Sequence, residues 1–174
     1  IDAADKASAG KQGCQMPFWR AYYHLIWATK NREPLITPGI ERQLYAHLIH
    51  VAADLGSYVY ALDGWTDHVH MVAAVPPHLA ISTFIKRLKG ASSHGINLSG
   101  NNDYFAWQRG YGALTLGQRQ LQDAVEYVRR QKQHHRDVTT ISWLERIAEV
   151  DEGPTTLRPV EDYDLPPSCA KTGQ

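Results

Sequence analysis

Apolar residues recur along this chain in two patterns, as short runs of aromatic and branched residues and as stripes with a helical period. The runs predict strands, because such side chains suit a pleated and half-buried backbone. They cover residues 19–29, 58–62 and 68–75. The stripes repeat with the spacing of an amphipathic helix. They predict helices over about residues 38–55, 80–96 and 118–135.

Weaker signals fill the remaining stretches. Asp63-Gly64 is a turn dipeptide and predicts a hairpin between the second and third strands. Residues 104–107 and 112–116 are short β candidates. A further apolar stripe predicts a helix over about residues 142–150.

The order of these elements is strand, helix, strand, strand, helix, strand, followed by more helix. This order predicts an α+β fold of the ferredoxin-like split βαβ type, with an antiparallel sheet, helices on one face and an extra C-terminal helix. We expect a single domain over residues 17–150. A small polar extension precedes it at residues 1–16, and an acidic, proline-rich tail follows at residues 151–174.

Composition excludes several classes of protein. The chain has 174 residues, of which 43% are hydrophobic and 21% charged, so it is not collagen-like, of low complexity or wholly disordered. No apolar run approaches the roughly 18 residues that cross a bilayer, and we expect no membrane association. Without a basic and apolar leader, we expect a cytoplasmic protein in which Cys14 and Cys169 are reduced.

The formal net charge of zero conceals an asymmetry. Residues 17–136 contain 13 Lys and Arg against 8 Asp and Glu, whereas residues 137–174 contain 3 against 8. A basic body beside an acidic tail is compatible with a protein that binds a polyanion. A solvated surface with an ordinary tail explains the same numbers.

The sequence Asp67-His68-Val69-His70 carries the first candidate chemistry. Residues i and i+2 of a strand point to the same face, so His68 and His70 lie side by side. Two neutral imidazoles in that arrangement can bind one metal ion. The alternative is a pair of histidines on a sheet surface.

The last predicted helix carries the second candidate. With 3.6 residues per turn, Leu121, Val125 and Val128 form one apolar stripe. Tyr127 falls well away from that stripe and shares a face with Gln131, one turn later. A core role for Tyr127 is therefore not expected, and a solvated surface tyrosine is the alternative to a functional one.

Five short motifs together resemble one protein family. In chain order they are His-Leu-Ile-Trp-Ala-Thr-Lys-Asn-Arg (24–32), Asp-His-Val-His-Met-Val (67–72), Leu-Lys-Gly-x-Ser-Ser (88–93), Trp-Gln-Arg-Gly-Tyr-Gly (107–112) and Tyr-Val-Arg-Arg-Gln-Lys-Gln-His-His (127–135). Over residues 18–136 the chain resembles the single-tyrosine HUH transposases of bacterial insertion sequences, including the related REP-associated tyrosine transposases. The fold of that family is the ferredoxin-like one.

The resemblance implies roles for four residues. Tyr127 is the nucleophile, His68 and His70 are metal ligands, and Gln131 is the third ligand. His134 shares the helix face of Tyr127 and Gln131 and is an alternative third ligand. The metal implied is Mg²⁺ or Mn²⁺, which suits two imidazoles and an amide oxygen.

The resemblance also implies the reaction and the partners. Tyr127 attacks a backbone phosphate of single-stranded DNA at an end marked by a hairpin, releasing a 3′-OH and forming a 5′-phosphotyrosine. A later 3′-OH can reverse this step and join a new strand. A homodimer is expected, in which the tyrosine helix can serve the histidine pair of the partner.

Basic and aromatic residues are candidates for the DNA contact. The candidate phosphate contacts are Lys86, Arg87, Lys89, Arg109, Arg129, Arg130 and Lys132. Tyr104, Phe105, Trp107 and Tyr111 can stack on unpaired bases, although most of them are expected in the core.

Three other readings remain open at this point. The chain can be a domesticated REP-associated transposase, which the motifs do not separate from the insertion-sequence branch. It can be a catalytically silent module that binds single-stranded nucleic acid. It can also be a metal-dependent hydrolase that uses His68 and His70 without a covalent step.

Overall fold

A computed structural model describes residues 18–100 and 104–148. The strands are β1 (Tyr22–Ala28), β2 (Tyr58–Gly64), β3 (His68–Ala74) and β4 (Gly112–Leu116). The helices are the short 3₁₀ turn η1 (Lys30–Arg32), α1 (Pro38–Asp54), α2 (Ile81–Leu98), α3 (Leu121–Arg129) and α4 (Gln131–Asp137). The strands predicted over 19–29, 58–62, 68–75 and 112–116 and the first two predicted helices are confirmed to within a few residues.

The four strands form one antiparallel sheet with the order β2-β3-β1-β4. β1 lies in the middle and pairs with β3 so that Ile26 faces His70 and His24 faces Val72. This is the sheet of the ferredoxin-like split βαβ fold that the sequence predicts.

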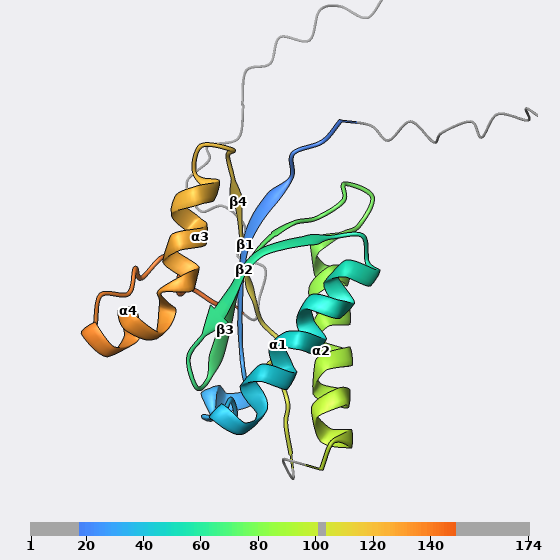
Figure 1. Cartoon of the computed structure of the whole chain (residues 1–174), viewed down its shortest axis with the longest axis vertical. Helices are drawn as coiled ribbons and strands as arrows, with labels where there is room; N and C mark the ends of the chain where they lie inside the picture. Colours follow the sequence, from blue (N-terminus) through green and yellow to red (C-terminus); the bar gives the residue numbers. More distant parts are fainter. Residues whose placement is uncertain (1–17, 101–103, 149–174) are drawn as a thin grey trace, which may run out of the picture.

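The main core lies between the sheet and the pair α1 and α2, which run side by side on one face (Figure 1). Alternate residues of the central strands point into it, including Leu25 and Trp27 from β1 and Met71 from β3. Leu44 of α1 and Phe84 of α2 meet them there and are fully buried. The other set of alternate residues is thereby turned to the opposite face.

α3 covers that opposite face, apart from α1 and α2 (Figure 1). Val125 and Val128 pack against Val72 of β3 and Ala61 of β2, with Leu144 closing the cluster. The extra C-terminal helix is therefore confirmed, and it lies on the sheet face that the other two helices leave open.

The predicted helix over 118–135 is wrong in its continuity. The backbone leaves helical geometry at Arg130, with φ −104° and ψ 13°, and α4 starts in a new direction. The apolar stripe ends at Val128, so no apolar side chain holds the following turn to the sheet. Val138, in a left-handed conformation with φ 53°, then ends α4.

Two other predictions are wrong, and the predicted hairpin between β2 and β3 is confirmed with its turn at a different position. The described part of 142–150 forms turns instead of a helix, and Ala148 makes an isolated β-bridge to Tyr111. Residues 104–107 form no strand, because the Asn97 side chain holds both backbone groups of Phe105. Asp63-Gly64 belongs to β2, and the hairpin turns after it, where the Trp65 amide donates to the His68 carbonyl.

No helix among the described residues is long and apolar enough to cross a membrane.

Gly112, at the start of β4, gives a test of how the 142–148 segment is held. A Cβ at this position would collide with the Arg146 carbonyl and lie 2.7 Å from Cγ2 of Ile26. We expect Gly112→Ala to lower the free energy of unfolding by about 1–3 kcal/mol, because the Arg146 backbone and the buried Ile26 side chain would have to shift. Urea unfolding measures this difference.

Gly90 is the matched control, because a Cβ there meets nothing within 4 Å. It lies exposed in α2, so Gly90→Ala is expected to stabilise the protein by up to about 1 kcal/mol. Equal effects of the two substitutions would contradict the close approach of the 142–148 segment to β4.

Candidate active site

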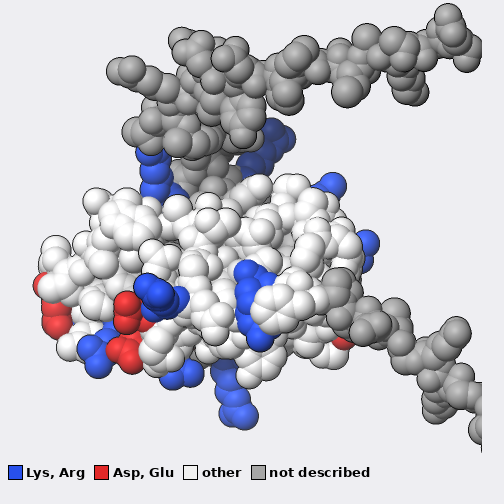
Figure 2. Space-filling view, turned by 90° about the horizontal axis from the view of Figure 1, so that it is seen from above, with Lys and Arg blue, Asp and Glu red and all other residues white. Residues whose placement is uncertain are grey.

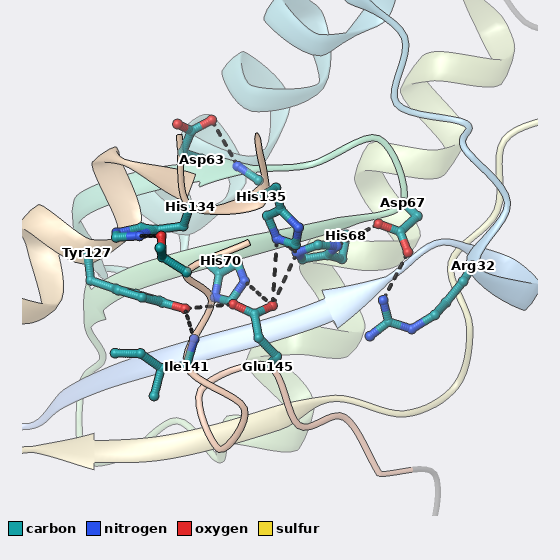
Figure 3. Close-up of polar contacts among 12 residues, drawn as sticks. Arg32, Asp63, Asp67, His68, His70, Tyr127, His134, His135, Ile141 and Glu145 are labelled. Atoms are coloured by element: carbon teal, nitrogen blue, oxygen red, sulfur yellow. Dashed lines mark hydrogen bonds and ion pairs between the residues drawn. The ribbon is translucent and has the colours of Figure 1, made fainter. Parts of the chain in front are cut away.

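Three histidines meet on the sheet face that α3 covers. His68 and His70 are two residues apart on β3, as the sequence predicts, and His24 lies beside them on β1. Their exposed fractions are 1% or less. Figure 3 shows His68 and His70 pointing toward Glu145 and Tyr127, which come from the C-terminal part of the described chain.

His68 is held through its Nδ1 atom. Asp67 Oδ1 lies 2.6 Å from that nitrogen, and Arg32 donates to the other Asp67 oxygen at 2.9 Å. Although burial opposes it, hydrogen bonding to Asp67 and Glu145 raises the pKa of His68. The Nε2 atom of His68 is thereby left facing the centre of the site.

His70 is held in the same way by a different partner. Its Nδ1 lies 2.8 Å from Nε2 of His24, and the two rings stack with an interplanar angle of 15°. Burial lowers the pKa of His70, and burial followed by repulsion from His70 lowers the pKa of His24 to about 3. Both rings are therefore neutral near pH 7.

Glu145 occupies the point on which the imidazoles converge. Its Oε2 lies 3.1 Å from Nε2 of His70 and 3.4 Å from Nε2 of His68, while its Oε1 accepts a hydrogen bond from the Tyr127 hydroxyl at 2.8 Å. Although burial would raise it, hydrogen bonds from His68 and His70 hold the pKa of Glu145 far below its ordinary value. The sequence analysis did not single out Glu145.

Tyr127 is buried, with an exposed fraction of 9%, and belongs to the cluster of Val125 and Val128. The expectation that it has no core role is therefore wrong, and so is the alternative of a solvated surface tyrosine. Tyr127 lies off the main stripe of α3, but the chain after α4 returns and covers that side. The Ile141 amide donates to the Tyr127 hydroxyl at 3.1 Å, and the His134 ring stacks on the phenol ring. Burial, followed by the hydrogen bond to Glu145, raises the pKa of Tyr127.

Gln131 lies directly after the break between α3 and α4 and is fully buried. The amide is close enough to the Tyr127 hydroxyl to oppose the rise in its pKa, yet it makes no hydrogen bond of acceptable geometry. Neither polar atom of its side chain has a partner within the described part of the chain. An unpaired buried amide is costly, and a ligand in the site would remove that cost.

The two histidines near the end of α4, His134 and His135, contact different residues. His134 stacks on Tyr127 and its Nδ1 contacts Thr139, so the structure does not bring it to the imidazole cluster. His135 reaches instead, with its Nε2 3.1 Å from Nε2 of His68. The break in the helix explains this exchange, because it rotates α4 away from the course that a continuous helix would take.

The donor atoms suit a small divalent cation. One ligand atom each from His68, His135 and Glu145 lies within 4.8 Å of the others. Imidazole nitrogen, carboxylate oxygen and the unpaired Gln131 amide are all groups that Mg²⁺ or Mn²⁺ accepts. The residues present therefore fit such an ion.

A family model described as "Transposase IS200 like" matches residues 17–131. The match spans more than half of the chain and includes both histidines of β3, Tyr127 and Gln131. The chain belongs to the IS200-like transposase family. A transposase cuts DNA, and the family gives the chain that general activity.

Individual relatives agree with the family match. The ISDra2 transposase TnpA of Deinococcus radiodurans is 30% identical over 118 residues, covering 63% of this chain and 82% of that protein. The transposase of insertion sequence element IS200 from Salmonella typhimurium is 26% identical over 118 residues, covering 63% of this chain and 77% of that protein.

Two solved structures share the fold. A crystallised Deinococcus radiodurans R1 protein assigned as a transposase has a TM-score of 0.53 at 27% identity, covering 70% of this chain and 98% of that one. A REP-associated tyrosine transposase bound to a REP hairpin has a TM-score of 0.53 at 16% identity, covering 69% and 74%. At that lower identity the likeness concerns the fold alone.

The seven basic residues predicted as DNA contacts do not all have free side chains. The Lys89 ammonium is largely buried and donates to the carbonyls of Gln108, Arg109 and Gly110, and burial lowers its pKa to about 8. Lys132 forms ion pairs with Glu41 and Asp63. On the face seen in Figure 2, Lys and Arg side chains stand apart from one another.

An open hollow of about 440 Å³ lies between α2 and residues 106–111. Lys86, Arg109, Trp107 and Tyr111 line it, which joins two predicted phosphate contacts to two predicted stacking residues. Phe105, by contrast, is fully buried in the main core, whereas Trp107 and Tyr111 are partly buried against it and Tyr104 is exposed. The expectation that most of these four aromatics lie in the core is therefore wrong.

The neutral state of His24 predicts how stability changes with pH. In the unfolded chain this imidazole takes up a proton below about pH 6.5, whereas in the folded protein its pKa is about 3. Between these two pH values the unfolded state therefore binds more protons than the folded state. His24 does not reduce the free energy of unfolding above pH 6.5, and it reduces it progressively as the pH falls toward 3. The slope is about 1.4 kcal/mol per pH unit for one such group.

Urea unfolding in the presence of a chelator, at about pH 7, 6 and 5, measures this slope. We expect His24→Phe to show a smaller loss of stability on acidification than the wild type. His94→Phe changes an exposed histidine of α2 and should leave the slope as it is. Identical slopes for all three proteins would show that His24 does not titrate as described.

Proposed function

We propose that this transposase cuts and rejoins single-stranded DNA at hairpin-marked ends, using Tyr127 as the nucleophile and a divalent cation held at His68 and His70. One observation carries the proposal. A buried tyrosine hydroxyl and two imidazoles of a His-x-His strand converge on the same carboxylate, Glu145, at 2.8–3.4 Å. This geometry supports the proposal that Tyr127 acts beside a metal site formed by its own chain.

Tyr127 and Glu145 have different roles in the first step. The Tyr127 oxygen attacks phosphorus, the bond from phosphorus to the 3′ oxygen breaks, and a 5′-phosphotyrosine forms. The phenol loses a proton, and the leaving 3′ oxygen gains one. Glu145 Oε1 already accepts a hydrogen bond from the Tyr127 hydroxyl, so it is the proposed acceptor of the phenol proton. Rejoining is the reverse step with a different 3′-OH, and it needs no ATP because the covalent link conserves the energy of the cut bond.

A bound Mg²⁺ or Mn²⁺ would orient the scissile phosphate and neutralise charge that develops on it. His68 and His70 would hold it through Nε2, and Gln131, whose amide is buried and unpaired, remains the proposed third ligand. Glu145 and His135 lie close enough to compete for that position. His134 is less suited to it, because its ring is stacked on Tyr127.

The DNA partner is proposed on two grounds. A transposase of the same fold binds a REP hairpin, and we extend that kind of substrate to this chain. Lys86 and Arg109 with Trp107 and Tyr111 offer charge and stacking surface at one hollow, which suits an unpaired strand. Arg87, Arg129 and Arg130 remain proposed phosphate contacts.

A homodimer is also proposed, from the family resemblance and because β2 and β4 are the edge strands of a small sheet. The structure brings Tyr127 to the histidine pair of its own chain, with ring centroids of Tyr127 and His70 6.2 Å apart. This distance supports a site in which Tyr127 acts at the histidine pair of its own chain.

Tyr127→Phe tests the covalent step. We expect loss of cleavage and of the protein–DNA adduct, while folding and DNA binding persist, because only one hydroxyl with two hydrogen bonds is removed, at a cost of about 0.5–1.5 kcal/mol each. The probe is a hairpin-bearing single strand labelled at its 3′ end, since the downstream fragment carries the phosphate that joins Tyr127. A denaturing gel detects the labelled protein.

Tyr58→Phe is the matched control, because Tyr58 is exposed at the start of β2. It should form the adduct as the wild type does. Cleavage that survives in Tyr127→Phe would favour a hydrolase without a covalent step, and hairpin binding without any cleavage in the wild type would favour a silent binding module.

His68→Ala and His70→Ala test the metal. Each should reduce cleavage in Mg²⁺ or Mn²⁺ by about 100-fold or more, because the loss of bound cation removes several kcal/mol of charge stabilisation. Gln131→Ala should give a comparable loss if its amide is the third ligand. His94→Ala, on an exposed helix surface, is the control. Full cleavage in excess chelator would refute the metal site.

A further inference from the structure

Each of the two proposed ligand histidines makes a hydrogen bond at Nδ1, but the partner residues differ in chemistry. Asp67 holds His68 at 2.6 Å, and His24 holds His70 at 2.8 Å. In both cases Nε2 is the atom turned toward Glu145. Nothing in the proposed reaction uses His24, although it is buried and lies against the site.

The difference matters because a carboxylate only accepts hydrogen bonds, whereas a neutral imidazole both donates and accepts. Asp67 therefore requires a proton on Nδ1 of His68. His24 can donate its Nε2 proton to His70 Nδ1, or accept a proton from that atom, without any change in the distance between them. His70 thus keeps a choice of tautomer that His68 lacks.

The contacts of His70 in the structure correspond to one of these choices. The carboxylate of Glu145 accepts from Nε2 of His70 at 3.1 Å, which places the proton of His70 on Nε2. Nδ1 of His70 then carries a lone pair, and His24 must be the donor between them. A cation at Nε2 needs the opposite, because a ligand nitrogen must present its lone pair.

We propose that His24 is a positioning residue that fixes the tautomer of His70 and reverses its own role, from donor to acceptor, when His70 binds the cation through Nε2. The proton on His70 moves from Nε2 to Nδ1, and the proton on His24 moves from Nε2 to Nδ1, so no net charge is gained. This inference rests on the proposed function, since it assumes a cation at His70.

The competing explanation is that His24 only fills space between β1 and α3. Its ring is 1% exposed and packs against both His70 and Tyr127, so an apolar ring of similar size would serve that purpose equally well. His24→Phe keeps a ring and removes both nitrogens. His24→Gln keeps a group that can donate or accept and loses the ring.

The first experiment measures Mn²⁺ affinity of the full chain, without DNA, from the electron paramagnetic resonance signal of the free ion. We expect His24→Phe to bind Mn²⁺ about 10–100-fold more weakly than the wild type, as found when the orienting partner of a ligand histidine is lost. His24→Gln should recover most of that affinity. His94→Phe is the control and should bind as the wild type does.

His70→Ala distinguishes a failure of the metal site from a failure of the positioning role of His24. Unchanged Mn²⁺ affinity in His70→Ala would refute the metal site itself. Weakened binding in His70→Ala, together with wild-type affinity in His24→Phe, would refute the positioning role of His24 and leave the metal site intact. A His24→Gln protein that binds as weakly as His24→Phe would also overturn the inference, because the hydrogen bond would then not be what matters.

The second experiment uses the wild-type protein alone and so does not depend on how a variant folds. Long-range ¹H–¹⁵N spectra of imidazole-labelled protein distinguish the two neutral tautomers of each histidine. We expect both His24 and His70 to carry the proton on Nε2 without metal, and both to carry it on Nδ1 in saturating Mg²⁺. A His24 tautomer that is the same in both conditions, while His70 changes, would overturn the proposal.

Discussion

The antiparallel pairing of β1 with β3 is the constraint on which the site depends. Because side chains alternate along both strands, the residues that fill the main core and the residues that build the site are interleaved. Leu25 and Met71 point to α1 and α2, and His24 and His70 point to α3. A shift of one residue in this register would exchange the two sets, so the burial of the core also fixes the histidines.

Glu145 is the shared polar partner of the buried side chains in the site. Several polar rings in a closed space are unfavourable unless their hydrogen bonds are satisfied. Its carboxylate satisfies Tyr127, His70 and His68 together, and in return these groups keep it ionised. The chain reaches this arrangement through Val138, a β-branched residue held in the left-handed region, which is a local conformational cost.

The sequence predicts the parts of the site that follow local periodicity and misses those that depend on the path of the chain. His68 and His70 share a face because they are two residues apart on one strand. His24 has the same alternation, but its position beside His70 requires the strand register, which no local pattern contains. Tyr127 and Gln131 are one turn apart in the predicted helix, and both lie in the site although the helix breaks between them.

Glu145 shows where local pattern fails completely. The apolar residues around it have a helical spacing, yet the described part of that stretch forms turns, because Leu144 is needed in the α3 cluster and Gly112 lets the backbone approach β4. The same tertiary packing buries Tyr127, which a helix wheel places away from the core. A wheel describes one helix in isolation, and it contains no information about a later segment that folds back over it.

Burial of Tyr127 opposes the role of nucleophile that we propose for it. A phenol is a poor nucleophile until it loses its proton, and burial together with a carboxylate neighbour makes that loss harder. Glu145 stabilises the protonated phenol as long as it remains hydrogen-bonded to it. A cation at His68 and His70 would draw on the same carboxylate that Tyr127 contacts, and would replace a negative neighbour of the phenol by a positive one. The hydrogen bond from Tyr127 to Glu145 is therefore the contact that a bound cation would disturb most directly.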